Sequence, residues 1–431
     1  TCRLSEKKAA ASQLMNLREH ACQLLEASLR GEPLIQPRDA NVALSFLSKT
    51  AILIHEDGDF ARAETVFERA VCYMNILQSA IANEASMDDL DVNKTIAMMF
   101  DTQVSRASNA ITLGEIEKGL LMLTTAASLA ATNSADDKLR TALLCKLVRV
   151  RLHIGKLLLN HVNASGDLLG TARSAAAVLE GAYDILTTHP QLLPSWMSHD
   201  EATGDPDGMD LDHEVSDDYD SLHVDVLRFA ACANVYAENY AAGIRGVELL
   251  RKGLEKKKSL MTPQLDFTLS YIMYLAKVST DAVTEACDCL KMMIENPEAK
   301  FETCLTAMNS LVRRAPDTVC VAVAHQFLRI VSDSHPERTI ARGGSIKMLE
   351  TFLDASKNAD TAVDAALILL SDGVVDKLLR EDADKSKLQV YNLLFTHAAA
   401  AFQCERWIVA DKLFQCSLDF QARAKSKSSP D

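Results

Sequence analysis

Small and large apolar residues alternate at helical spacing on both sides of a short polar turn in the first part of the chain. The positions are, in order, Leu47, Ala51, Ile54, the turn Gly58-Asp59-Phe60, Ala63, Phe67 and Ala70. Spacings of three and four residues put each set on one face of a helix. Alanine suits a point where two helices cross closely, and larger residues fill the space beside the crossing. The pattern therefore predicts two antiparallel helices joined by a tight turn.

The same spacing returns in three further copies. They run through Gln103, Ala107, Ala110, Gly114-Glu115-Ile116, Gly119, Leu123 and Ala126; through Leu227, Ala231, Asn239-Tyr240, Gly243, Val247 and Leu250; and through Leu394, Ala398, Ala401, Glu405-Arg406-Trp407, Ala410, Phe414 and Ser417. Tetratricopeptide (TPR) hairpins have this character, but the copies do not follow the TPR period of about 34 residues. We therefore predict an all-α fold, a superhelical α-solenoid of divergent TPR-like helical hairpins with an acidic disordered insertion.

The composition agrees with a helical array. The 431 residues are 48% hydrophobic and only 5% aromatic, with 16 Gly and 10 Pro. Few Gly and Pro residues with abundant Ala and Leu favour helix over strand. In a solenoid each repeat contacts only its neighbours, so a chain of this length need not divide into globular domains. No apolar run approaches the roughly 18 residues that a membrane-spanning helix needs.

The acidic insertion is residues 198–220, which contain ten Asp or Glu residues, lack Lys and Arg, and supply most of the net charge of −14. Such a segment has too little apolar surface to offset its ordering entropy. We expect TPR-like repeats at 1–197, an acidic flexible loop at 198–220, further TPR-like repeats at 221–424 and a flexible tail at 425–431. The loop is either a solvated insertion or a docking segment for a basic surface. Its docking candidates are Asp210, Asp212, Glu214, Asp217 and Asp218.

A search for reactive groups predicts no catalytic, cofactor-binding or metal site. The eleven cysteines include no C-x-x-C pair, which disfavours zinc. His199, His213 and His223 have spacings that fit no tight metal site. The segment Gly343-Gly344-Ser345-Ile346-Lys347 lacks the phosphate-loop spacing, so we expect a turn at the start of a helix there. We therefore expect no enzyme activity, no cofactor and no metal.

Protein binding is the function that the repeats favour. In a stack of TPR-like hairpins the first helices line the concave face, which is open to a peptide or a partner helix. The concave-face candidates are Ser48, Ile52, His55, Val104, Ser108, Arg228, Tyr236, Phe395, Phe402 and Gln403. The alternative at each position is packing between neighbouring hairpins. The basic run Lys256-Lys257-Lys258 is expected at a helix end, and the sequence pI near 5.3 argues against direct nucleic-acid binding.

Two stretches resemble the meiotic TPR scaffold family called sporulation-specific protein 22 or Zip-four, whose mammalian relative is a testis-expressed TPR protein. The first stretch is Ile154–Leu159 (IGKLLL) with Ala175–Leu186 (AAAVLEGAYDIL), and the second is Leu393–Phe420 (LLFTHAAAAFQCERWIVADKLFQCSLDF). The chain departs from the family pattern at Trp407, where the family often has Tyr, and at Leu413-Phe414, where it often has a Trp-containing pair. The resemblance covers residues 41–420, and because the family's proteins are longer, we expect the chain to be a segment.

The resemblance implies a non-enzymatic nuclear scaffold on meiotic chromosomes, in the ZMM group that promotes crossovers. Its expected partners are a crossover-promoting complex with an XPF-like partner pair, and components of the chromosome axis and the synaptonemal complex. Neither a membrane nor direct nucleic-acid contact is implied. The alternative function is a generic TPR-like subunit of another multiprotein complex, such as a ubiquitin-ligase or transport assembly, with the cytosol as the alternative location. An enzyme with a helical domain is the third class, which tight binding of a nucleotide or metal would indicate.

Overall fold

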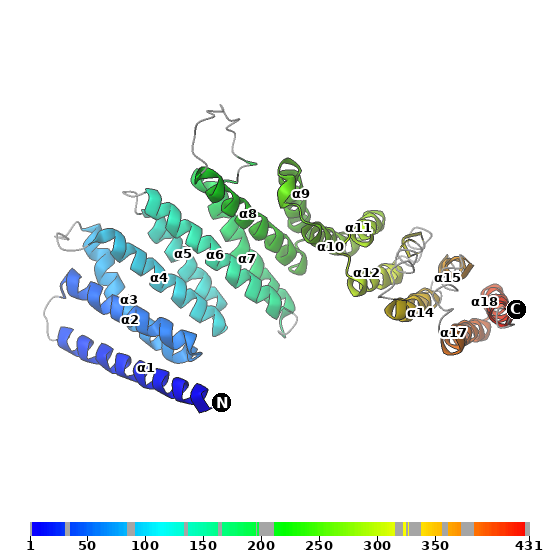
Figure 1. Ribbon diagram of the computed structural model, residues 1–431, viewed down its shortest axis with the longest axis horizontal. Helices are drawn as coiled ribbons and strands as arrows, with labels where there is room; N and C mark the ends of the chain where they lie inside the picture. Colours follow the sequence, from blue (N-terminus) through cyan, green and yellow to red (C-terminus); the bar gives the residue numbers. More distant parts are fainter. Residues whose placement is uncertain are drawn as a thin grey trace. The chain divides into compact units, whose positions relative to one another are not determined.

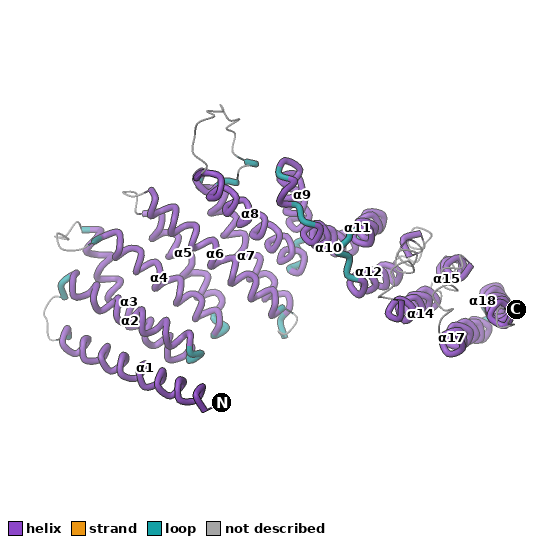
Figure 2. Tube along the Cα trace, in the orientation of Figure 1, coloured by secondary structure: helices purple, strands orange, loops and turns teal. Residues whose placement is uncertain are grey.

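The computed structural model is helical in all of its regular elements, within the part of the chain that it describes (Figure 2). The chain divides into two compact units, Thr1–Ala237 and Glu238–Asp431. The division lies beyond the acidic segment. The described residues are 2–30, 35–83, 91–132, 137–162, 166–194, 196–197, 211–314, 322–324, 326, 338–355, 361–371 and 383–426.

In the first unit, the helices lie side by side in chain order (Figure 1). Hairpins are formed by α2 with α3, α4 with α5 and α6 with α7, and α8 packs against α7. Helices α2, α4, α6 and α8 also contact one another in that order, and we call them the first-helix layer. The bounds are α1 Cys2–Leu29, α2 Pro37–Glu56, α3 Phe60–Ala82, α4 Val92–Thr112, α5 Ile116–Thr132, α6 Asp137–His161, α7 Leu168–Thr188, the 3₁₀ turn η1 Pro190–Leu192, and α8 Leu211–Tyr236.

The second unit continues the helical pairing. Helix α10 packs with α9 and α11, α14 with α12 and α15, and α17 with α18. Both units thus consist of helices that pack on their neighbours in tandem, which confirms the predicted all-α solenoid architecture. The bounds are α9 Tyr240–Lys256, the 3₁₀ turn η2 Lys258–Leu260, α10 Pro263–Ser279, α11 Val283–Glu295, α12 Phe301–Arg314, α14 Arg338–Ala355, α15 Thr361–Ser371, α17 Ala383–Gln403 and α18 Trp407–Ser426.

Three of the predicted hairpins share one turn geometry. After α2, α4 and α17 the backbone passes through a left-handed residue, which is Gly58 (φ 91°), Gly114 (φ 84°) or Glu405 (φ 59°). In each turn the next residue donates its N–H to the carbonyl five residues earlier, at 3.2, 2.8 and 3.0 Å. This is the Schellman end of a helix, which satisfies carbonyls that the helix leaves unpaired. The fourth predicted copy falls across the division at Ala237, so its helices α8 and α9 belong to different units.

A further hairpin of the same kind, formed by α10 and α11, was not predicted from the sequence pattern. Asp281 is the left-handed residue (φ 57°), and Ala282 donates its N–H to the Lys277 carbonyl at 2.9 Å. Seven residues before this turn, the other copies carry alanine, but here Tyr274 occupies the position. The Tyr274 ring is buried, and its hydroxyl donates to the Ala307 carbonyl of α12 at 2.5 Å. A large side chain thus replaces the small one because it also joins the hairpin to the next helix.

Small residues stand at the close crossings, as the spacing predicted. Ala51, Ala63 and Ala107 are fully buried. Opposite Ala107 stands Gly119, where an added Cβ would lie 2.5 Å from Ile111 Cγ1 and 3.0 Å from the Ala107 carbonyl oxygen. Contacts this short require neighbouring atoms to move, so glycine is the residue that lets α4 and α5 approach.

The acidic segment is where the expected loop and the structure differ. Helix α8 begins at Leu211, so residues 211–220 are helical where we predicted a flexible loop, and residues 198–210 lie outside the described residues. Leu211, Val215, Tyr219 and Leu222 recur at intervals of four and three residues, which is a helical spacing. Tyr219 packs against the core and Leu222 is buried in it. This apolar stripe accounts for helix formation in spite of the charge.

We expect replacement of Gly119 by valine to destabilise the α4–α5 hairpin, because the new methyl groups would overlap Ile111 and the Ala107 carbonyl. The free energy of unfolding should fall by about 1–3 kcal/mol, as is typical of overpacking. The matched control is Gly166→Val, because no atom lies within 4 Å of a Cβ added there. Denaturant unfolding followed by circular dichroism measures both, and equal losses would contradict the close crossing.

We expect Glu405→Gly to stabilise the α17–α18 turn, because the left-handed conformation costs a residue with a Cβ about 1 kcal/mol or more. The melting temperature should rise, and the reciprocal change Gly114→Ala should lower it for the same reason. A lower melting temperature for Glu405→Gly would show that the glutamate side chain makes a contact that outweighs the backbone strain.

Candidate protein-binding surface

Two of the concave-face candidates lie between neighbouring hairpins. Ser48 is only 4% exposed and its hydroxyl lies 2.7 Å from the hydroxyl of Thr102 on α4. His55 lies in the same interface, with Nδ1 2.9 Å from Asn109 Oδ1. Ser48 and His55 thus both make contacts between neighbouring hairpins, where Ser48 is buried and His55 is half-buried.

These contacts belong to a regular polar ladder between α2 and α4. Its third rung places the Thr95 hydroxyl 3.3 Å from Asn41 Oδ1. Successive rungs are seven residues apart on both helices, which is about two helical turns, so all three lie on one face of each helix. Partners in every rung are separated by 54 residues. The rungs of the polar ladder are Asn41–Thr95, Ser48–Thr102 and His55–Asn109.

An ion network extends the last rung to α3 and α5. The Asn109 amide donates to the Glu64 carboxylate at 3.3 Å, so its carbonyl oxygen is left to accept from His55 Nδ1–H. Arg106 and Lys118 contact the same carboxylate at 2.7 and 2.9 Å. Burial raises the pKa of Glu64, but the hydrogen bonds and charges of Arg106 and Lys118 outweigh burial and hold that pKa below its ordinary value. The nearly buried Glu64 is thus ionised and paired.

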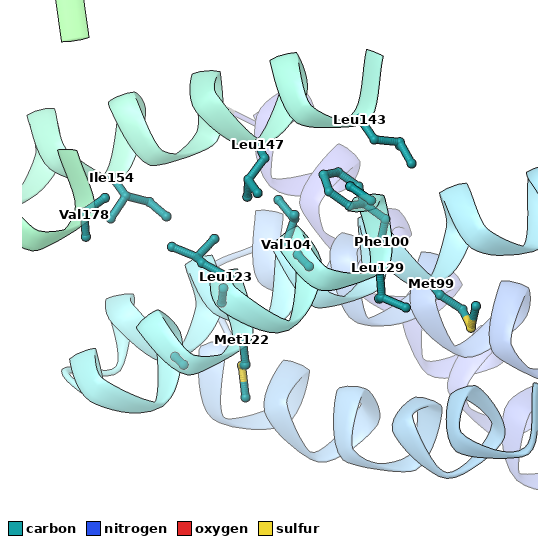
Figure 3. Packing of buried hydrophobic residues seen from close by; sticks show 14 of the residues in the cluster. Met99, Phe100, Val104, Met122, Leu123, Leu129, Leu143, Leu147, Ile154 and Val178 are labelled. Carbon is teal, nitrogen blue, oxygen red and sulfur yellow. The ribbon is translucent and has the colours of Figure 1, made fainter. Parts of the chain in front are cut away.

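Three other candidates are wholly or partly covered. Val104 is 5% exposed and lies in the core beside Leu123 and Leu147 (Figure 3), so little of its side chain is accessible to a partner. Ile52 is half-buried and packs against the same core, and Ser108 is half-buried. The hydrophobic spacing of α4 explains Val104, because α4 is covered by α2, α5 and α6 and keeps little free surface.

Arg228 is half-buried, and the other four predicted residues are more accessible. Tyr236 is 40% exposed on α8, Phe395 is 48% and Phe402 54% exposed on α17, and Gln403 is exposed. The Phe402 ring meets the exposed Trp407 edge-on, with 4.7 Å between ring centroids. Exposed aromatic side chains are frequent anchors in protein interfaces. The structure thus places a paired aromatic surface on the α17–α18 hairpin.

The acidic candidates lie at the start of α8 or before it. Asp210 lies outside the described residues, and the described side chains of α8 begin at Tyr219. The structure therefore gives no contact for these residues as docking groups. The four that fall in the first turns of α8 are Asp212, Glu214, Asp217 and Asp218.

Other residues singled out for their chemistry have structural places. His223 is fully buried, its Nε2–H donates to the Leu192 carbonyl at 2.8 Å, and burial lowers its pKa. Gly343-Gly344 lies inside α14 and not at a helix start, so the expected turn there is wrong. Helix α9 ends at Lys256, as predicted for the basic run.

Among the described residues there is no cluster of three or more His, Cys, Asp or Glu side chains placed to hold a metal ion. In the same residues we find no helix with the length and apolar character to span a bilayer.

A basic helix was missed by the sequence reasoning. Helix α6 carries six Lys or Arg residues and one acidic residue, Asp137, in a chain of net charge −14. The signal was present as 19 consecutive positions, 138–156, that lack Asp and Glu and carry basic residues at helical intervals. With Arg228 of the neighbouring α8, four of its residues form a surface that we call the basic stripe. The basic stripe is Lys146, Arg149, His153, Lys156 and Arg228.

The basic stripe is held in place by carboxylates on both neighbouring helices. Lys146 contacts Asp101 of α4 at 2.7 Å, and Lys156 contacts Asp225 of α8 at 2.9 Å. Asp225 also pairs with Arg228 at 2.7 Å. Lys156 Nζ and Arg228 Cζ lie 4.6 and 4.5 Å from the centroid of the Phe229 ring, within the range of cation–π attraction. These contacts orient the cations on the first-helix layer.

Comparison with known proteins assigns no family. No family model matches the chain, and no curated protein matches it. Among solved structures the chain is similar to a circular tandem repeat protein with novel repeat topology and enhanced subunit contact surfaces. That likeness has a TM-score of 0.29 and 13% sequence identity, and it covers 98% of this chain and 92% of the other.

Replacement of Glu64 by glutamine should remove the charge that pairs with Arg106 and Lys118, at a loss of about 1–3 kcal/mol of unfolding free energy at pH 7. Because the folded pKa of Glu64 lies below its ordinary 4.5, this stabilisation is complete above about pH 4.5. It is lost as the pH falls through the folded pKa. Urea unfolding should therefore show a smaller difference between wild type and variant at pH 3 than at pH 7.

The control for this prediction is Glu68→Gln. Glu68 lies 3.7 Å from the same Arg106, but its side chain is 60% exposed, so we expect a change below about 0.5 kcal/mol at both pH values. If the difference in unfolding free energy between wild type and Glu64→Gln were larger at pH 3 than at pH 7, Glu64 would not be the ionised, paired group that we describe.

Proposed function

We propose that the chain is a non-enzymatic scaffold that binds partner proteins in meiotic recombination, where it supports crossover formation and synaptonemal complex assembly. The scaffold role is supported by helical hairpins in tandem, because each hairpin adds surface without forming a new core. The single observation that carries this role is the exposed side chains on such hairpins: the aromatic pair Phe402–Trp407 and the basic stripe.

The meiotic assignment is supported by the two sequence stretches that resemble the Zip-four family. In the first stretch, Gly155 of α6 stands against α7, and a Cβ added there would lie 2.5 Å from Leu179 Cγ. The two parts of that stretch, Ile154–Leu159 and Ala175–Leu186, therefore meet at one helix crossing. The second stretch, Leu393–Phe420, makes up most of the α17–α18 hairpin. On this proposal the partners are a crossover-promoting complex with an XPF-like pair, the chromosome axis and the synaptonemal complex, and the location is the nucleus.

The test is capture of the tagged full chain from meiotic cells after mild cross-linking, with quantitative mass spectrometry. We expect recombination, axis or synaptonemal complex proteins among the enriched partners. We also expect Phe402→Ser with Trp407→Ser to reduce partner recovery about tenfold, because exposed aromatic anchors commonly contribute 2 kcal/mol or more to binding.

The matched control for this experiment is Leu121→Ser, which removes a 69% exposed apolar side chain from α5. It should leave partner recovery unchanged. Enrichment of ubiquitin-ligase or transport subunits in place of meiotic proteins would overturn the meiotic part of the proposal. Recovery of no specific partner would overturn the scaffold role as well.

A further inference from the structure

The basic stripe points outward from the middle of the first-helix layer. Helix α6 lies between α4 and α8, and its exposed positions include Lys146, Arg149, His153 and Leu157. These positions are three or four residues apart, so they follow one side of the helix. The side chains of Lys146 and Lys156 stay 52% and 34% exposed although each contacts a carboxylate. The cations are therefore oriented and still accessible.

The charge of the stripe is opposite to that of the chain. Helix α6 has a formal charge of +5, from six basic residues and one acidic residue, while the whole chain carries −14. Ten of the chain's acidic residues lie in 198–220, and those from Asp212 to Asp220 are on α8, which packs against α6. Screening at physiological ionic strength limits the reach of exposed charges to about 8 Å. The exposed Lys146, Arg149 and His153 therefore act over short distances only, through direct contact, and such contact favours an acidic partner.

The apolar groups in the stripe indicate which acidic partner fits. Leu157 is 42% exposed next to Lys156 on α6, and the half-buried Phe229 adjoins Lys156 and Arg228. A peptide can place leucine-like side chains on these groups and carboxylates on the cations. Nucleic acid fits less well, because two cations already occupy the Phe229 ring and a base cannot stack freely there.

We propose that the basic stripe of α6 and α8 is a docking surface for an acidic amphipathic segment of a partner protein, in which Asp or Glu alternates with apolar residues at helical spacing. The proposal rests on the scaffold role proposed above and adds the chemistry of one partner to it. Carboxylates of the segment pair with Arg149, His153 and Lys146, and its apolar residues contact Leu157 and Phe229.

Fluorescence anisotropy with the full chain tests the surface. The probe is a labelled 20-residue peptide in which Glu and Leu follow helical spacing, and the comparison peptide has Gln at every Glu. We expect the Glu peptide to bind at least about tenfold more tightly, with affinity that falls as salt rises. Arg149→Glu should weaken binding about five- to tenfold, because it replaces an attraction by a repulsion. Arg149→Gln removes the positive charge without adding a negative one, so it should weaken peptide binding less than Arg149→Glu does.

The matched control is Lys49→Glu, which makes the same change in net charge at an exposed position of α2 outside the stripe. It should change the affinity less than twofold. Equal binding of the Glu and Gln peptides, or equal losses in Arg149→Glu and Lys49→Glu, would overturn the proposal. So would tighter binding of a 20-nucleotide single strand that Arg149→Glu abolishes, because the surface would then be a nucleic-acid site.

The outcomes separate this inference from the proposed function. Failure of peptide binding while meiotic partners are still captured would remove the docking surface and leave the scaffold role in place. Peptide binding with the expected dependence on Arg149, but without capture of meiotic partners, would keep the surface and remove the meiotic assignment.

Discussion

The close approach of two helices beside each tight turn is the constraint on which the rest of the structure depends. At Ala107 with Gly119 a larger side chain would hold the two helices apart, and Ala51 and Ala63 are fully buried in the α2–α3 hairpin. The left-handed residue at the turn returns the second helix at the angle that makes this approach possible. Because the crossing is built within each hairpin, hairpins can differ in length and still stack. The irregular intervals along the sequence are compatible with a regular local geometry for this reason.

Polar contacts then fix how one hairpin sits on the next. The polar ladder joins α2 to α4, and ion pairs join α1 to α3 in a similar way. Arg62 donates to Glu19 at 2.7 Å and Arg69 to Glu26 at 2.9 Å, again with seven residues between successive contacts. Apolar packing alone tolerates sliding of one helix along another, whereas a missed hydrogen bond at a buried position is costly. Apolar packing at the crossings therefore forms the hairpins, and the regularly spaced polar contacts set the register between neighbouring helices.

The sequence was sufficient for hairpins with small residues at fixed distances from the turn, and insufficient for the others and for most of the surface. Ala398 and Ala410 could be recognised because small residues at fixed distances from a turn have one main structural use. The α10–α11 hairpin could not, because Tyr274 serves a second neighbour and breaks the pattern. Ser48 looked available to a partner because a polar residue on a first helix usually faces water. Its hydrogen-bond partner, Thr102, is 54 residues away in the sequence. Equal seven-residue spacing of polar residues on two helices was the signal that could have revealed it.

The polar ladder also determines how the α2–α4 interface responds to mechanical load. A pull along the helix axes stretches all three rungs together, so the hydrogen bonds share the force and resist as a group. A load that prises the helices apart from one end acts on a single rung at a time, and each then yields separately. The interface is therefore stiff against shear and compliant against peeling. A bending load can therefore open this interface from one end without sliding α2 along α4.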